Sequence, residues 1–152
     1  DHPDRARASS LSAQMARPIL AGLGLTSEQV QAASHAIEAH SFSANVRPET
    51  REAKILQDAD RIEALGAIGI ARCFATTGAM GGALFHGLDP FGQSRPLNDK
   101  AYAVDHFKLK LLGLPETMQT LSGRKLAEDR ANVLRDFLDQ LASELDVPAS
   151  GW

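Results

Sequence analysis

Apolar residues recur at helical spacing along most of the chain, and this pattern predicts an all-α fold. The first predicted helix covers residues 4–23. It carries Leu11, Met15, Ile19 and Leu23 on one face, because residues four apart lie above one another on a helix. Pro18 falls inside this segment and should kink or split the helix.

Five further helices are predicted, separated by glycine, proline and capping residues. Their expected ranges are 27–40, 51–65, 66–77, 100–112 and 116–145. The expected N-caps are Thr26 or Ser27, Thr50, and Asn98 or Asp99, since their side-chain oxygens can accept from the first backbone N–H groups.

Glycines shape the middle of the chain. Gly66 and Gly69 lie within an apolar helical stretch and are expected to let that helix pack closely against a neighbour. Residues 78–87 are Gly-rich and apolar, and residues 88–97 contain two prolines and a glycine, so an irregular connection is expected there.

Composition narrows the class of protein. The 152 residues suit a single domain, and the low aromatic content of 5% favours helices over a β-sandwich. A net charge of −3 implies no basic surface for a nucleic-acid polymer. No apolar run approaches the roughly 20 residues of a membrane helix, and the lone Cys73 is expected to be a small buried residue, so a cytoplasmic location is expected.

The first candidates for chemistry are Asp58 and Asp60, two carboxylates in the segment QDADRIEALGAIGIAR. On a helix they point roughly 200° apart and cannot both enter one site. Ile55, Ala59, Ile62 and Gly66 mark the expected apolar face, which places Asp58 toward the core and Asp60 toward solvent or a cleft. A solvated acidic face is the alternative interpretation.

Two histidines, His35 and His40, lie in the segment SHAIEAHSF. Their spacing of five turns the second ring roughly 140° from the first on a continuous helix, unlike the four-residue spacing of helical metal ligands. Either histidine could contact a metal or a phosphate, and a hydrogen-bonded, half-buried histidine is the alternative. The adjacent Asp105 and His106 point in different directions on a helix, which favours packing or surface roles.

The chain resembles the HD superfamily of metal-dependent phosphohydrolases, in a bacterial branch of HD domain-containing proteins. Four segments carry the resemblance in order: DHPDRARAS, HAIEAHSF, ILQDADRIEALGAIGIAR and DHFKLKLLGLPETMQT. They cover nearly the whole chain. The resemblance implies a compact all-α HD-type helical bundle over residues 1–152.

The resemblance also implies a divalent metal, Mn²⁺, Mg²⁺ or Fe²⁺, held by a first His, a His-Asp dyad and a final Asp. The family's Ala-Asp-x-Leu pattern matches Ala59-Asp60-Arg61-Ile62, which makes Asp60 the implied ligand and leaves Asp58 as a supporting or alternative one. No His-Asp dipeptide occurs in the chain. The expectation is therefore that the first His and the dyad lie upstream in a longer protein, or that the metal site has been lost.

The expected activity is hydrolysis of a nucleotide or another small phosphate ester, with a nucleoside triphosphate releasing pyrophosphate or phosphate as one form. His40 is the candidate proton donor or acceptor, and Arg61 the candidate for stabilising charge on phosphate. His35, His40 and Arg72 are candidates for phosphate contact or a second metal. Two other functions remain open: a non-catalytic module that binds a ligand or partner, and a helical oligomerisation domain, with a homodimer as one form.

Overall fold

The computed structural model of the protein describes residues 5–148 and 152. Its α-helices are α1 (Arg5–Gly22), α2 (Ser27–Ala39), α3 (Arg51–Ile62), α4 (Gly66–Ala79), α5 (Ala103–Leu109) and α6 (Leu121–Glu144), and its 3-10 helices are η1 (Phe42–Ala44) and η2 (Leu111–Thr117). The described part of the chain contains an isolated β-bridge, Ala83 to Tyr102, and no strand. The all-α prediction is confirmed. The chain divides into two compact units, Asp1–Asp60 and Arg61–Trp152.

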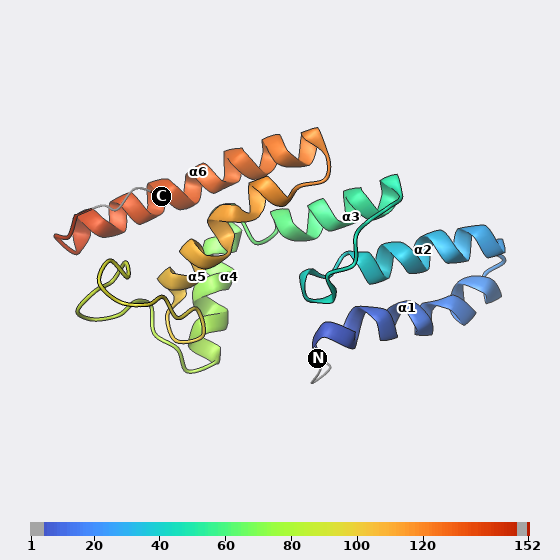
Figure 1. Ribbon diagram of the computed structural model, residues 1–152, viewed down its shortest axis with the longest axis horizontal. Helices are drawn as coiled ribbons and strands as arrows, with labels where there is room; N and C mark the ends of the chain where they lie inside the picture. The colour runs from blue at the N-terminus through green and yellow to red at the C-terminus, as the bar shows by residue number, and fades with distance from the viewer. Residues whose placement is uncertain (1–4, 149–151) are drawn as a thin grey trace. The chain divides into compact units, whose positions relative to one another are not determined.

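In the first unit, α1 and α2 pack side by side along their length (Figure 1). The turn between them passes through Gly24, whose φ of +85° favours glycine. Thr26 caps α2 as predicted, and it forms a reciprocal capping box with Gln29. Pro18 lies inside α1, and the assigned helix continues through it, so the predicted split is wrong. Asp4, the predicted start of this helix, lies outside the described residues.

The predicted apolar face of α1 is wrong. Met15, Ile19 and Leu23 are 71%, 63% and 72% exposed, whereas Ser9 and Ala13 are buried. The buried positions precede the predicted ones by two residues, which is roughly 200° around the helix. Small side chains on the buried face let two helices approach closely. The spacing of the large apolar residues in the sequence does not indicate that this face is the buried one.

In the same unit, α3 begins after Thr50, whose hydroxyl accepts from the backbone N–H of Ala53 and confirms the predicted cap. The Gln57 side chain is buried and donates through Nε2 to the Ala39 carbonyl at 2.7 Å. Ala39 also belongs to a small cluster of buried apolar side chains: Ala36, Ala39 and Ala53, with Val46 packed against them.

The expected apolar face of α3 is only partly correct. Ile62 is buried, but Ile55 is 50% exposed and Ala59 is also exposed. The other buried positions are Ala53, Gln57 and Asp58, two of which are polar. Tertiary packing has therefore selected a polar side of this helix, which hydrophobicity alone could not indicate.

Three phenylalanine rings from three helices meet in the second unit, where Phe107 belongs to the buried core and the partly buried Phe74 and Phe137 pack against it. Phe74 of α4 lies 5.8 Å from Phe107 of α5 and 5.7 Å from Phe137 of α6, between ring centroids. Such aromatic contacts stabilise a core beyond the area that they bury. Cys73 is buried beside them, as predicted, and burial raises the pKa of its thiol.

The glycines of α4 act differently from the prediction of close packing between helices. Gly66 has a φ of +70° and lies against the aliphatic part of Arg130 on α6. A Cβ at Gly69 would lie 2.2 Å from the Ala64 carbonyl oxygen. The absence of a side chain at Gly69 therefore lets the backbone turn just before α4 lie close to the helix, and this contact is not with a second helix. The prediction is right for Gly66 and wrong for Gly69.

Two predicted helices start later than expected. Asn98 caps a turn by accepting from the Lys100 N–H, and α5 starts only at Ala103, because Ala103 first pairs with Ala83 in the bridge region. The 3-10 helix η2 contains Pro115, and α6 begins at Leu121 after its cap residue Thr120. Residues 111–117 form η2 instead, and Met118 has an extended backbone, so α6 does not start at residue 116.

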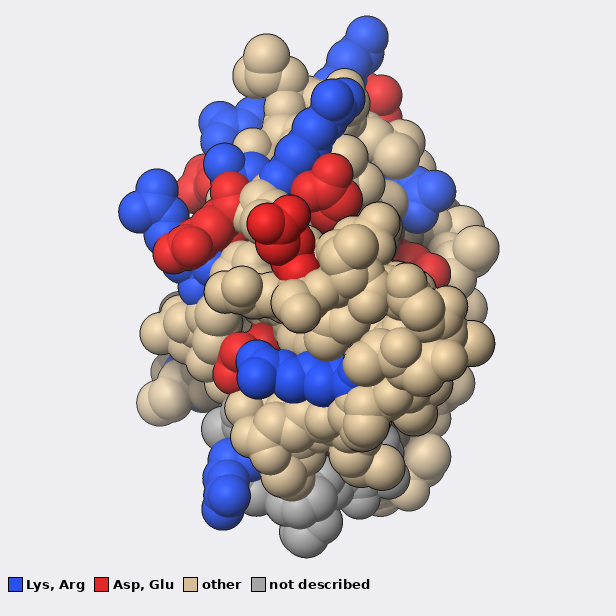
Figure 2. Space-filling view, turned by 90° about the vertical axis from the view of Figure 1, so that its right-hand side faces the viewer, with Lys and Arg blue, Asp and Glu red and all other residues tan. Residues whose placement is uncertain are grey.

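The charged side chains are mixed in sign where they can be seen together. Figure 2 shows one face of the molecule, on which lysine and arginine side chains lie among aspartate and glutamate side chains. Neighbouring carboxylates offset the basic charge on this face, in keeping with the net charge of −3.

Candidate functional site

The two carboxylates of α3 have opposite environments. The Asp58 residue is 3% exposed, whereas Asp60 is exposed to solvent. This is the placement that helical periodicity predicts, with Asp58 inward and Asp60 outward. The two carboxylates do not form a chelating pair, because residues two apart on a helix diverge by roughly 200°.

His35 ties a loop to α2. Its Nε2 accepts a hydrogen bond from the Glu49 backbone N–H at 2.9 Å. An accepting Nε2 means that the neutral ring carries its proton on Nδ1. A phosphate bound at His35 would therefore accept from Nδ1–H. A metal needs the unprotonated nitrogen, so it would have to displace the Glu49 N–H from Nε2. The alternative interpretation of a hydrogen-bonded, half-buried histidine describes what the structure shows for this residue.

His40 is the C-cap residue of α2, and its ring turns back toward the helix. Its Nδ1 lies 2.5 Å from the Ile37 carbonyl oxygen, so Nδ1 carries the proton that is donated. Nε2 is then the basic nitrogen of the neutral ring. A histidine with one nitrogen fixed by a backbone carbonyl is oriented for proton transfer through the other.

Arg61 and Arg72 belong to the second unit. Arg61 Nη1 donates to the Thr117 carbonyl at 2.6 Å, a contact within this unit between its first residue and η2. Arg72 is exposed on α4, and its Nη1 lies 3.4 Å from a carboxylate oxygen of Glu63. Arg61 thus has a structural contact, while Arg72 forms a long, solvent-exposed ion pair.

The donor set for a divalent metal is incomplete in what the structure describes. Among those residues, no three His, Cys, Asp or Glu side chains come together as a metal-binding group. The diverging Asp58 and Asp60 do not supply such a group by themselves. Hard divalent cations need several oxygen or nitrogen ligands, so the described residues do not fit a complete metal site.

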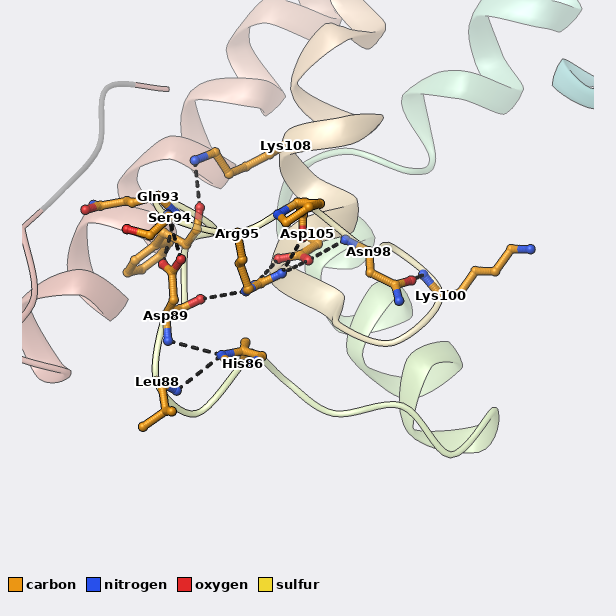
Figure 3. Close-up of polar contacts among 12 residues, drawn as sticks. His86, Leu88, Asp89, Gln93, Ser94, Arg95, Asn98, Lys100, Asp105 and Lys108 are labelled. Atoms are coloured by element: carbon orange, nitrogen blue, oxygen red, sulfur yellow. Dashed lines mark hydrogen bonds and ion pairs between the residues drawn. The ribbon is translucent and has the colours of Figure 1, made fainter.

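A polar cluster of the second unit that the sequence did not indicate lies around Asp105, in the first turn of α5 (Figure 3). Arg95, in the connection before α5, pairs with Asp105 through two contacts, Nη1–Oδ2 at 2.6 Å and Nη2–Oδ1 at 2.7 Å. The Asn98 N–H also donates to Asp105, whose side chain is fully buried. An aspartate within the apolar run AYAVDHF signals a buried partner, but nothing in the sequence identifies Arg95.

Hydrogen bonds also hold the earlier part of the loop before α5, residues 89–94, in place. The Asp89 carboxylate accepts from the backbone N–H groups of Ser94 and Gln93, which lower the pKa of Asp89. Lys108 of α5 donates to the Phe91 carbonyl at 2.9 Å. The predicted irregular segment is therefore an ordered loop held against α5 by charged side chains.

A cleft of about 160 Å³ lies in the second unit, between α4 and the segment that leads into α5. Its lining includes Arg72, Cys73, Thr76, Asp99 and His106. Burial lowers the pKa of His106, and the Lys110 ammonium adds to this effect. The hydrogen bond from Lys110 is the main cause that lowers the pKa of Asp99.

Comparisons with known proteins agree with this architecture. No protein-family model matches the chain. An uncharacterized protein of Bacillus subtilis, YpgQ, is 44% identical over 101 residues, which are 66% of this chain and 42% of YpgQ. The crystal structure of YpgQ in complex with ADP superposes with a TM-score of 0.70 and 32% identity, covering 90% of this chain and 62% of that one.

Two further solved structures are similar. An HD-superfamily hydrolase from Bacillus thuringiensis has a TM-score of 0.69 and 31% identity, covering 90% of this chain and 63% of its own. The Lin1889 protein of Listeria innocua has a TM-score of 0.72 and 28% identity, covering 95% of this chain and 72% of its own.

The fold is thus that of an all-α, HD-type helical protein. The similarities assign the chain to the HD-domain superfamily, as the sequence resemblance implied. The chain spans 42% of YpgQ in the sequence alignment and 62% of it in the structural one. In the part that the structure describes, no helix has the length and apolar character needed to cross a bilayer.

Proposed function

We propose that this HD-domain protein is a phosphohydrolase that acts on a nucleotide or another small phosphate ester. The observation that carries the proposal is the similarity to YpgQ, which was crystallised with ADP. The structural similarity covers 90% of this chain and 62% of YpgQ. The similarity to an HD-superfamily hydrolase supports the hydrolytic part. A nucleoside triphosphate that releases pyrophosphate or phosphate is the substrate form that we favour.

The residues of this chain have separate proposed roles. His40 is the proposed proton donor or acceptor, because Nδ1 is held by a backbone carbonyl and leaves Nε2 as the basic nitrogen. Arg72 is a proposed phosphate contact, since a guanidinium matches phosphate oxygens well. Arg61 and His35 are proposed to support these groups; both already hold backbone atoms in place.

Dependence on Mn²⁺, Mg²⁺ or Fe²⁺ is also part of the proposal. Asp60 is the proposed ligand, because it matches the family pattern and its side chain reaches solvent. The buried Asp58 is proposed to support α3 at this point. A metal held there would supply charge stabilisation and an activated water.

The test uses the purified full-length protein. Metal content is measured for the wild type, Asp60→Ala and the control Asp136→Ala, which alters an exposed carboxylate on α6. Nucleoside mono-, di- and triphosphates are then screened for turnover with Mn²⁺. We expect Asp60→Ala alone to lose metal and turnover. Unchanged metal content in Asp60→Ala would exclude this ligand, and a metal-loaded protein without turnover of any phosphate ester would exclude the enzyme.

A non-catalytic nucleotide-binding module is the second candidate. The diverging carboxylates of α3 favour it, since they do not chelate one ion together. This candidate predicts that ADP binds to the full-length protein with equal affinity in EDTA and in Mn²⁺, without any hydrolysis of the corresponding triphosphate.

A further inference from the structure

The cleft of the second unit has one wall that offers hydrogen-bond donors to an anion. Arg72 and Thr76 are exposed residues of α4, four positions apart, so they lie on one face of the helix. Both line the cleft. The floor includes the buried Cys73 and Thr77, and a cleft of about 160 Å³ suits a small polar group.

Arg72 is held loosely in its present contact. Its side chain is 59% exposed, that of Glu63 is 72% exposed, and Nη1 lies 3.4 Å from the Glu63 carboxylate. The same Nη1 donates a long hydrogen bond of 3.3 Å to the Glu63 carbonyl oxygen, which is also exposed. Exposed pairs of this length contribute little to stability, because water screens them. The guanidinium can therefore exchange Glu63 for a stronger, bidentate anion at small cost.

The opposite wall carries a carboxylate whose charge is already balanced. Asp99 Oδ2 lies 2.5 Å from Lys110 Nζ and 3.5 Å from His106 Nδ1. An incoming anion therefore meets a neutralised ion pair instead of an unpaired carboxylate. A neutral His106 that donates from Nδ1 to Asp99 also keeps Nε2 able to take up a proton.

We propose that this cleft binds the phosphate group of a small ligand, with Arg72 and Thr76 as donors from α4 and His106 as a proton-accepting group on the other wall. The site needs neither metal nor turnover. It therefore goes beyond the proposed hydrolysis and gives Arg72 a defined set of partners. The phosphate belongs either to free inorganic phosphate or to a nucleotide, since both present the same oxygen atoms.

Phosphate binding should change the protonation of His106. A bound phosphate favours the cationic imidazole, so the pKa of His106 should rise when phosphate is present. The charged groups that face this ring are Asp99 and Lys110, while Arg72 and Glu63 lie on the α4 side. Because Asp99 and Lys110 remain paired in both states, the rise reports the added anion.

The experiment follows the imidazole resonances of His106 by NMR in EDTA, with the full-length protein. Inorganic phosphate, ADP and adenosine are added separately. We expect phosphate, ADP or both to shift His106 in a saturable way and to raise its pKa, whereas adenosine should do neither. A response to phosphate identifies the free ion as sufficient, and a response to ADP alone identifies a nucleotide phosphate.

Variants separate binding from structure. Arg72→Gln should weaken the apparent affinity at least about tenfold, as expected for losing a charge-assisted contact. Thr76→Val should weaken it less, and Glu63→Gln should strengthen it, because the variant removes the carboxylate that competes with phosphate for Arg72. Arg124→Gln, which alters an exposed arginine of α6 outside the cleft, is the matched control and should change nothing.

Two results would overturn the proposal: no saturable response to either phosphate ligand, or equal responses in wild type and Arg72→Gln. Neither result depends on turnover. A protein that binds phosphate at His106 but hydrolyses nothing would remove the proposed enzyme and leave this site. A protein that hydrolyses nucleotides without a response at His106 would support the proposed enzyme and exclude this phosphate site.

Discussion

Arg95 and Asp105 form a two-point ion pair in which the aspartate side chain is fully buried and the arginine side chain is 15% exposed. Asp105 is the main cause that raises the pKa of Arg95. The Arg95 guanidinium also lies 4.8 Å from the centre of the Tyr102 ring. This pair joins the loop before α5 to the helix itself and so holds the loop against α5.

Removing Asp105 should therefore destabilise the protein strongly. In Asp105→Ala, Arg95 and the Asn98 N–H lose their acceptor in a buried place. We expect the free energy of unfolding to fall by about 3–5 kcal/mol, which is typical of breaking a buried pair from one side. Urea denaturation measures this change. The control Asp136→Ala, on the exposed face of α6, should stay within about 0.5 kcal/mol.

The double replacement Arg95→Met with Asp105→Leu tests whether the loss of stability in Asp105→Ala comes from leaving Arg95 unpaired. Removing both charges leaves no buried group unpaired, so much of the lost stability should return. Asp105→Ala with wild-type stability would contradict the structural role of this pair.

A second prediction concerns two glycines on α4. Gly69→Ala places a Cβ 2.2 Å from the Ala64 carbonyl oxygen, a clash with backbone that side-chain motion cannot relieve. At Gly78 a Cβ meets nothing within 4 Å. Gly69→Ala should therefore destabilise the protein by more than about 1 kcal/mol, while Gly78→Ala should be neutral or stabilise it by about 0.5–1 kcal/mol.

Thermal unfolding of the two variants gives the comparison directly, since both make the same chemical change in the same helix. Equal melting temperatures would show that the turn before α4 adjusts freely. A loss at Gly78 would show instead that the end of α4 has contacts that a methyl group disturbs.

The sequence predicted the helical elements better than it predicted which face of each helix is buried. Thr26 and Thr50 were recognisable caps, because their chemistry is local. The buried face of α1 depends on Ser9 and Ala13, small residues that carry little hydrophobic signal. Packing against a second helix decides this choice, and a single-sequence pattern does not contain that information.

The candidate site shows the same division. Periodicity placed Asp58 inward and Asp60 outward, and the structure agrees. The contacts of His35 to Glu49 and of Arg61 to Thr117 join residues 14 and 56 positions apart. Such pairings arise only when the chain folds, so their partners could not be named in advance.

A third prediction separates the two carboxylates of α3. Asp58→Asn alters a buried carboxylate that is 3% exposed, and it should lower the free energy of unfolding by about 1–3 kcal/mol. Asp60→Asn alters an exposed one and should stay within about 0.5 kcal/mol. Denaturant unfolding in EDTA, which removes any contribution of a metal, gives both values.

The comparison has a clear opposite result. If Asp60→Asn were the more destabilising variant in EDTA, Asp60 would have a structural role and its assignment as the proposed metal ligand would lose support. If neither variant changed stability, the burial of Asp58 would have no energetic consequence.

A fourth prediction concerns pH. Burial lowers the pKa of His106 in the folded protein below its ordinary value of 6.5. The unfolded chain therefore binds a proton at this position more readily than the folded one. The contribution of His106 is fully favourable above about pH 6.5, and it is lost progressively as the pH falls below that value. His106→Gln should remove this part of the pH dependence.

The free energy of unfolding of the wild type and His106→Gln should thus be compared between about pH 8 and pH 5, without phosphate. The difference between the two proteins should shift in favour of the variant as the pH falls, because glutamine takes up no proton. Lys110→Met should reduce the effect, since the Lys110 ammonium also lowers the pKa of His106. Parallel curves for wild type and His106→Gln would show that His106 titrates alike in both states. Added phosphate provides the last check. If phosphate binds beside His106, it raises the pKa of this ring. The loss of stability at low pH should then become smaller in the wild type but not in Arg72→Gln.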